Sequence, residues 1–402
     1  MSLVTPTFNH KALMRVAMVM AFIQFANALE YMMFNPIFAF MAADFAVPVS
    51  FSGYVSGMYT AGAVLSGIIA FYRIGRFNKK RFLIANMALL GLLTFLTTFT
   101  SSFSLLLTLR LCAGLVGGTT MGVGISILIN NTPTHLHGKM LATVIASFSM
   151  VSIVGMPTIL FLCAHYGWHV ALWLISTLCV LALPLIVFII PREPVSFDRL
   201  PAQPLDADTL LFASSNALAQ FSPMLVVPVL VPLMTQQLGA SQDLLPWLFF
   251  AGGVAGYLST KMTGVLISRF SALMLATGST IVFILSLLIP MLGYQHAALF
   301  MTLFLGASYS RLVSSSAVAI QFPDDGQRAG FSSLQTSIMY LITTVAFFLS
   351  AFLLPEHGMA PQNINKLLAV CAISASGLPV IVIILQKKLA KRTLRPDHPI
   401  VD

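Results

Sequence analysis

Long apolar segments alternate with short polar connectors over the whole of this 402-residue chain. About twelve such segments occur, each of roughly 18 to 28 residues, and a helix of about 20 apolar residues crosses a hydrocarbon core about 30 Å thick. The pattern therefore predicts an all-α membrane protein with twelve transmembrane helices. The predicted spans are residues 13–42, 50–72, 82–101, 104–130, 141–163, 170–190, 209–236, 244–268, 272–292, 297–321, 330–354 and 366–386.

The longest polar connector is rich in proline and divides the spans into six plus six. Both halves place a basic residue in the loop after their second span and an arginine inside their fourth, Arg110 and Arg311. This repetition predicts two pseudo-symmetric six-helix bundles, and in transporters built this way the substrate site lies near the bilayer midplane. The predicted parts are an N-terminal bundle at 1–190, a cytoplasmic linker at 191–208, a C-terminal bundle at 209–386 and a basic cytoplasmic tail at 387–402.

Composition and charge narrow the class further. Only 8% of the residues are charged, too few for a water-soluble surface, where about 25% is usual. The net charge of +9 comes from basic runs beside the spans, which favours anionic lipid rather than nucleic acid as the partner. Of the 21 Lys and Arg residues, all but four lie on one side of the predicted membrane, so the positive-inside rule predicts that both termini are cytoplasmic. The exceptions are Arg110, Lys261 and Arg311 inside spans, and Lys366 on the other side.

Several short motifs resemble those of one transporter family. Gly67-Ile68-Ile69-Ala70 and the basic residues that follow, among them Arg76, are similar to the cytoplasmic loop signature of the major facilitator superfamily, although its acidic residue is absent. Arg110-Leu111-Cys112-Ala113-Gly114 and Gly155-Met156-Pro157 resemble motifs of its twelve-helix drug:proton antiporter group. The resemblance implies a transporter that works by alternating access. It also implies that Gly67, Arg76, Gly155 and Pro157 take part in the conformational change.

Glu30 is the only carboxylate deep inside a span, and charges at that depth are rare and usually functional. A carboxyl group that alternates between a dry and a wet environment can take up and release a proton, as a proton carrier must. The alternative is a permanent ion pair with Arg110, and both hold if protonation is what breaks the pair. Arg110 also begins a stripe of small residues, Gly114, Gly118 and Gly122, so it can equally serve to tie helices together.

The second half contains two cations in its spans without a deep carboxylate. Lys261 and Arg311 could bind an anionic substrate. Alternatively, Lys261 extends to the membrane interface and Arg311 binds backbone carbonyls. Ser308, Arg311 and Ser315 share one helical face, which we expect to line the cavity.

Amide side chains occur on the spans that line the central cavity in the resembled family. Gln24 and Asn27 precede Glu30 on one face of the first span, and Asn216 and Gln220 lie one turn apart on the seventh. They are candidate substrate ligands, or simply interhelical hydrogen-bonding groups. Prolines predict bends that would allow the two halves to rock, or else static curvature. They are Pro36 in the first span and Pro223, Pro228 and Pro232 in the seventh.

Together these features predict a proton-coupled secondary transporter of the bacterial inner membrane, acting as a monomer that exports a small organic molecule. One alternative is a proton symporter that imports an anionic metabolite. Another is a sensor or scaffold that transports nothing. No phosphate-binding loop, nucleophile elbow or zinc motif occurs at a suitable position, so we expect neither an enzyme nor a cofactor. The four cysteines lack metal-ligand spacing and are interpreted as small buried side chains: Cys112, Cys163, Cys179 and Cys371.

Overall fold

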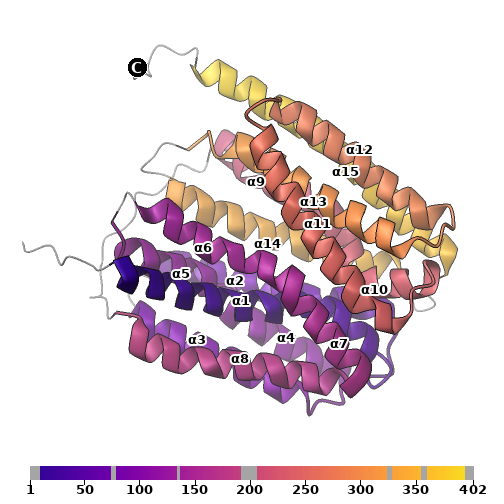
Figure 1. The fold of residues 1–402 in the computed structure, drawn as a ribbon, viewed down its shortest axis with the longest axis horizontal. Coiled ribbons are helices and arrows are strands. Elements are labelled where there is room, and N and C mark those ends of the chain that lie inside the picture. Colours follow the sequence, from indigo (N-terminus) through magenta and orange to yellow (C-terminus); the bar gives the residue numbers. More distant parts are fainter. Residues whose placement is uncertain are drawn as a thin grey trace, which may run out of the picture.

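The computed structural model describes residues 10–73, 78–133, 136–191, 206–323, 328–354 and 360–393, and the regular structure in these residues is helical (Figure 1). The first half comprises α1 (His10–Met41), α2 (Ser52–Arg73), α3 (Lys79–Thr97), α4 (Phe103–Gly117), α5 (Thr120–Asn130), α6 (His137–Met150), the π-helical turn η4 (Val151–Gly155), α7 (Met156–Tyr166) and α8 (Trp168–Ile189). The second half comprises α9 (Ala207–Val226), the short turns η5 (Val227–Val229), α10 (Leu230–Pro232) and η6 (Leu233–Gln237), then α11 (Leu245–Leu266), α12 (Ala272–Met291), α13 (Ala297–Ala319), α14 (Arg328–Leu353) and α15 (Pro361–Thr393).

All twelve predicted spans are helical in the residues that the structure describes. In the part of the chain that the structure describes, ten helical stretches are long and apolar enough to cross a membrane. The remaining two predicted spans are α2 and α11, which have 22 residues each and are rich in Gly, Ser and Thr. Each is the second span of its half, and each packs against the other half. Small residues suit such positions because they let helix backbones approach closely.

Three predicted spans are interrupted helices. The fourth is broken between α4 and α5. The fifth passes through η4 directly before Pro157, because a proline has no N–H for the preceding turn and the helical register loosens there. The seventh changes to the short turns η5, α10 and η6 around Pro228 and Pro232, which confirms the predicted distortion. Pro36, in contrast, lies inside a continuous α1.

Two helices extend past their predicted spans through basic residues. Helix α3 begins at Lys79, where Asn78 caps it by accepting a hydrogen bond from the Arg81 amide at 3.0 Å, so its basic residues are helical and not in a loop. Helix α15 continues to Thr393, seven residues past the predicted end of the span. An ion pair between Lys388 and Asp208 of α9 holds this extension against the second half. Arg76, residues 192–205 of the predicted linker and residues 394–402 of the predicted tail lie outside the described residues.

The apolar cores show how the two halves meet. One large cluster contains residues from both halves. The first half contributes the last part of α1, α7 and the start of α8, and the second half contributes the segments around η5 and the start of α11. This cluster lies at the end of the bundle opposite the chain termini. At the terminal end, two separate clusters occur. One is built essentially from the first half, and the other from α9, α12, α13, α14 and α15. The halves therefore share a core at one end only.

Two of the contacts between the halves are made by closely packed helices. Along the first, α2 packs on α14, and a Cβ atom on Gly53 would lie 2.3 Å from the Phe347 carbonyl oxygen. Thr344 of α14 donates a hydrogen bond of 2.8 Å to Thr60 of α2. Along the second, α11 packs on η4 and α7. Beside this contact, the hydroxyl of Ser152 on η4 is hydrogen-bonded at 3.1 Å to that of Tyr309 on α13. The helices pack closely at both contacts, and side-chain hydrogen bonds add to them.

Candidate functional site

A buried ion pair occupies the first half. Glu30 of α1 pairs through its Oε1 with Nη1 of Arg110 of α4, and the two side chains are 0% and 1% exposed. The hydroxyl of Thr94, on α3, donates to the same carboxylate oxygen at 3.3 Å. The guanidinium lies 3.7 Å from the centre of the Phe34 ring and 4.6 Å from that of Tyr59. Three helices and two aromatic rings therefore hold the pair, and the ion pair that the sequence offered as one alternative is present.

Polar atoms around this pair lack hydrogen-bond partners among the described residues. They include the second carboxylate oxygen of Glu30, Oε2, and the Nε and Nη2 atoms of Arg110. The hydroxyl of Tyr59 and the Oδ1 atom of Asn27 are also buried without a partner. Both lie beside Gly117 of α4, where a Cβ atom would be 2.2 Å from the hydroxyl and 3.0 Å from Oδ1. Since buried polar groups are nearly always hydrogen-bonded, this cluster has capacity for a proton, water or a polar ligand.

Close helix packing fixes the position of Arg110. A Cβ atom on Gly114 would lie 1.9 Å from the Tyr59 carbonyl oxygen, and one on Gly118 would lie 2.5 Å from the Cα of Ala63, so α4 and α2 touch through their backbones. The stripe predicted from the sequence is confirmed at these two positions. It is wrong at Gly122, where nothing lies within 4 Å.

A series of tyrosines links the ion pair to the second half. The Tyr59 ring stacks on Tyr31 with centroids 5.1 Å apart, and Tyr31 meets the edge of Tyr340, on α14, at 6.1 Å. Sequence reasoning missed these three residues and Thr94. The available signal was that Tyr31 directly follows Glu30 and that Tyr59 and Tyr340 lie well inside apolar segments, where a phenol hydroxyl usually has a partner.

Arg311 has a different environment in the second half. Its Nη2 donates to the Ala375 carbonyl of α15 at 3.2 Å, and its guanidinium lies 4.7 Å from the centre of the Phe283 ring of α12. The side chain is fully buried, and no carboxylate of the described residues pairs with it. Its Nε and Nη1 atoms have no hydrogen-bond partner there, and neither has the buried hydroxyl of Ser315 one turn further on. The hydroxyl of Ser308 bonds within its own helix, to the Phe304 carbonyl at 2.6 Å.

Lys261 is separate from this group. It is exposed, and its ammonium lies 5.8 Å from the centre of the Tyr257 ring one turn earlier. It lies five residues before the end of α11 at Leu266. This position fits the interfacial alternative better than a buried substrate contact.

The predicted amide ligands are buried on α1 and α9. Gln24 and Asn27 are 4% and 3% exposed, and Asn216 is 8% exposed with an Oδ1 that has no partner among the described residues. Gln220 is half-buried. Their positions keep both alternatives open, ligand binding and helix association.

The residues expected to take part in motion differ in their surroundings. A Cβ atom on Gly155 would lie 2.7 Å from Leu29 Cδ1, so this glycine lets η4 approach α1 next to Glu30. Pro157 begins α7 directly after that turn. A Cβ atom on Gly67 would lie 3.5 Å from Oγ of Ser337 on α14, an ordinary contact distance, so this position does not by itself require glycine.

A twelve-span bundle with one core shared between its halves and a buried ion pair in one of them defines a membrane transporter fold. The sequence model of the Major Facilitator Superfamily matches residues 20–211. The chain has the fold of this superfamily over nearly its whole length, and the family's sequence model matches just under half of it.

Known relatives are transporters. The chain is 22% identical over 362 residues to the purine ribonucleoside efflux pump NepI of Escherichia coli K12, a match that covers 87% of the chain and 89% of NepI. It is also 22% identical over 258 residues to the putative transporter AraJ of the same organism, covering 62% of the chain and 64% of AraJ.

Solved structures resemble the chain over nearly its whole length. A bacterial homologue of the human lysosomal transporter Spinster, inward-facing and occupied, superposes with a TM-score of 0.73 at 13% identity, covering 98% of the chain and 100% of that structure. A D-xylose-proton symporter superposes with a TM-score of 0.69 at 14% identity, covering 91% and 97%. These likenesses support the fold.

Proposed function

We propose that the chain is a proton-coupled secondary transporter of the drug:proton antiporter-like group, which exports a small organic molecule by alternating access. The observation that supports this most strongly is Glu30. It is a fully buried carboxylate at the middle of α1, and it uses one oxygen for Arg110 and Thr94 while the other has no described partner. Oε2 is therefore the atom that would accept a proton.

Protonation at Oε2 would neutralise the carboxylate and weaken its attraction for Arg110. The guanidinium would then depend on the rings of Phe34 and Tyr59. Tyr59 stacks on Tyr31, and Tyr31 contacts Tyr340 of α14. A shift of Arg110 would therefore displace side chains at the contact between the halves. This series of contacts is the proposed connection between proton binding and movement of the halves.

Alternating access is supported by the unequal cores. The halves share one core at the end away from the termini and have separate cores at the terminal end. The site would thus be reached from the terminal side, which is the cytoplasm in the predicted topology. Exchange to the other state would open the shared core and bring the two separate cores together. The irregular turns η4 and η6 lie in spans that pack at this shared end.

Export is proposed from similarity: NepI is named as an efflux pump of purine ribonucleosides. A second candidate is symport of an anionic metabolite into the cell. It is favoured by Arg311, a buried cation with two donor atoms that lack described partners. Under that alternative, Arg311→Gln would raise the Michaelis constant more for an anionic substrate than for a neutral analogue. Lys261→Gln would raise the Michaelis constant for the anionic substrate less than Arg311→Gln does.

The proposal is tested with the purified full chain in proteoliposomes under an imposed pH gradient. The panel would contain nucleosides, cationic drugs, sugars and organic anions, and internal pH would be followed with a trapped dye. We expect a substrate of the panel to move against its gradient while protons move in the opposite direction. Protons and substrate moving in the same direction would establish the symport alternative. No flux of any compound, in protein that is correctly folded, would favour the sensor or scaffold.

A further inference from the structure

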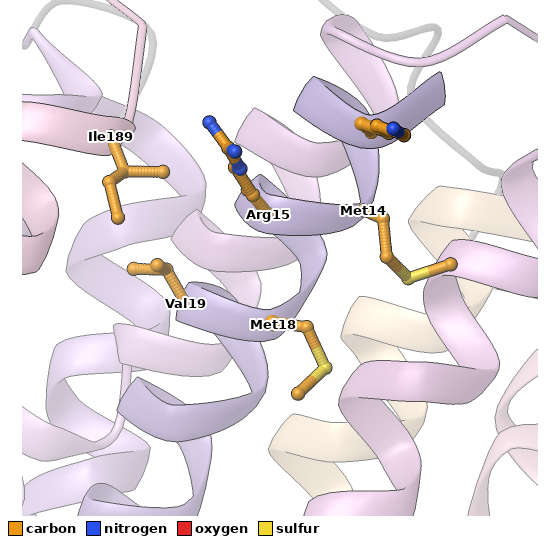
Figure 2. Close-up of a pocket in the computed structure, with 6 residues that line it drawn as sticks. Met14, Arg15, Met18, Val19 and Ile189 are labelled. Carbon is orange, nitrogen blue, oxygen red and sulfur yellow. The ribbon is translucent and has the colours of Figure 1, made fainter. Parts of the chain in front are cut away.

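A hollow of about 490 Å³ lies beside the first turns of α1, where the end of α8 approaches it (Figure 2). Lys11, Met14, Arg15, Met18, Val19 and Ile189 line it. A second hollow of about 260 Å³ adjoins it and shares Arg15 and Ile189. Figure 2 shows Arg15 extending from α1 into the space between Ile189 and Met14. The arginine therefore stands at the border of two largely apolar hollows.

Arg15 has no counter-ion among the described residues. Its side chain is exposed, and no hydrogen bond or ion pair to a described residue is formed. Only two carboxylates occur between His10 and Pro191 in the sequence, Glu30 and Asp44. Glu30 is engaged with Arg110, and Asp44 accepts a 2.6 Å hydrogen bond from Trp168 at the opposite end of the bundle. At the terminal end of the first half, the described residues therefore contain basic side chains and no carboxylate.

The rest of the site is apolar and faces outward. Met18, one turn deeper than Arg15, is 58% exposed, and Phe188 beside Ile189 is 85% exposed. In a transmembrane helix such exposed apolar side chains face lipid. The end of α8 is held in place by Lys80, whose ammonium donates to the carbonyls of Val187 at 2.8 Å and Ile190 at 2.6 Å. The groove between the start of α1 and the end of α8 thus combines a cation with an apolar wall. This combination is complementary to a ligand with an anionic head and a hydrocarbon tail.

We propose that this groove binds an anionic phospholipid, with the phosphate on Arg15 and Lys11 and an acyl chain along Met18 and Ile189. Basic residues close to a membrane span attract anionic headgroups, and the adjoining apolar wall adds burial of the chain. The proposal does not depend on the transported substrate or on proton coupling.

The test is lipid binding to the purified full chain by native mass spectrometry. Phosphatidylglycerol and phosphatidylcholine with identical acyl chains would be titrated into wild type, Arg15→Gln and Arg81→Gln. Arg81 is the matched control, because it is an exposed arginine at the same end of the first half, on α3. We expect Arg15→Gln to weaken binding of the first phosphatidylglycerol molecule roughly fivefold and to leave the affinity for phosphatidylcholine unchanged. Arg81→Gln should weaken phosphatidylglycerol binding less than Arg15→Gln does.

A second variant tests the acyl groove. Met18→Gln keeps the charge and should reduce retention of both lipids, since it removes apolar surface from the wall. Displacement of phosphatidylglycerol by inorganic phosphate alone would identify a free-phosphate site and overturn the proposal. Equal losses for Arg15→Gln and Arg81→Gln would also overturn it, because they would show diffuse attraction to a basic surface.

Discussion

The two halves share one architecture, yet each has a buried arginine in a different chemical setting. Arg110 has a carboxylate, a hydroxyl bonded to that carboxylate, and two aromatic rings around it. Arg311 has one backbone carbonyl and one ring, and no described carboxylate. The repeated fold therefore does not repeat the charge arrangement. Among the described residues, a buried titratable pair occurs in the first half alone, and the second half contains a buried cation with donors that lack described partners.

The largest effect should come from removing the carboxylate. Glu30→Gln keeps the shape of the side chain but takes away its ability to release a proton at neutral pH, so we expect gradient-driven transport to fall to the level of empty liposomes. Exchange of substrate across the membrane without a gradient should remain measurable. Asp44→Asn is the control, because it changes the other first-half carboxylate. Concentrative transport by the Glu30→Gln protein would show that Glu30 is not the proton carrier.

The second test compares the arginines by stability. Arg110→Met leaves the Glu30 carboxylate buried without its partner and should cost about 3–5 kcal/mol, whereas Arg311→Met strands no charge and should change stability by only about 1 kcal/mol. Thermal unfolding in one detergent would measure both. Adding Glu30→Gln to Arg110→Met should recover most of the loss, because the stranded charge is then gone. Equal losses for the two arginines would contradict the difference between the halves.

A smaller effect is expected at the point where the first half contacts α14. Tyr340→Ala removes the edge contact with Tyr31, a kind of contact worth about 0.5–1.5 kcal/mol, or roughly two- to tenfold in an equilibrium. We expect it to reduce substrate moved per proton, measured as the ratio of the two fluxes. Tyr340→Phe keeps the ring and should behave like wild type. If Tyr340→Phe lowers the flux ratio as much as Tyr340→Ala does, the hydroxyl and not the ring of Tyr340 couples the two fluxes.

The smallest effect concerns the caps of two helices. Asp206 accepts a hydrogen bond from the Thr209 amide at 2.9 Å, and this contact holds its pKa below the ordinary value for aspartate. A lowered pKa in the folded state means that the cap stabilises α9 above the unfolded pKa and loses that contribution as the pH falls through the folded value. Asp206→Ala should cost about 1 kcal/mol or less at neutral pH and less still in acid. Asn78 caps α3 without titrating, so Asn78→Ala should have the same effect at both pH values in unfolding experiments.

Sequence reasoning predicted the twelve spans and the depth of Glu30, and it gave pairing with Arg110 as one of two alternatives. Hydropathy and helical periodicity report the length of a helix and the depth of a residue in it, and these were sufficient for those conclusions. They do not report how a helix is rotated against its neighbours. For this reason the sequence did not show that Arg311 points toward α12 and α15, or that Tyr31, Tyr59 and Tyr340 form a connected series. It also placed a single helix where Pro157 produces a π-helical turn.

The core shared by both halves has a consequence for the temperature dependence of the protein. Opening that end would expose apolar side chains such as Phe38, Leu230 and Phe249. Hydration of apolar surface raises the heat capacity, so the step that separates the halves should have a positive activation heat capacity. The logarithm of its rate would then follow a curve, and not a straight line, against inverse temperature.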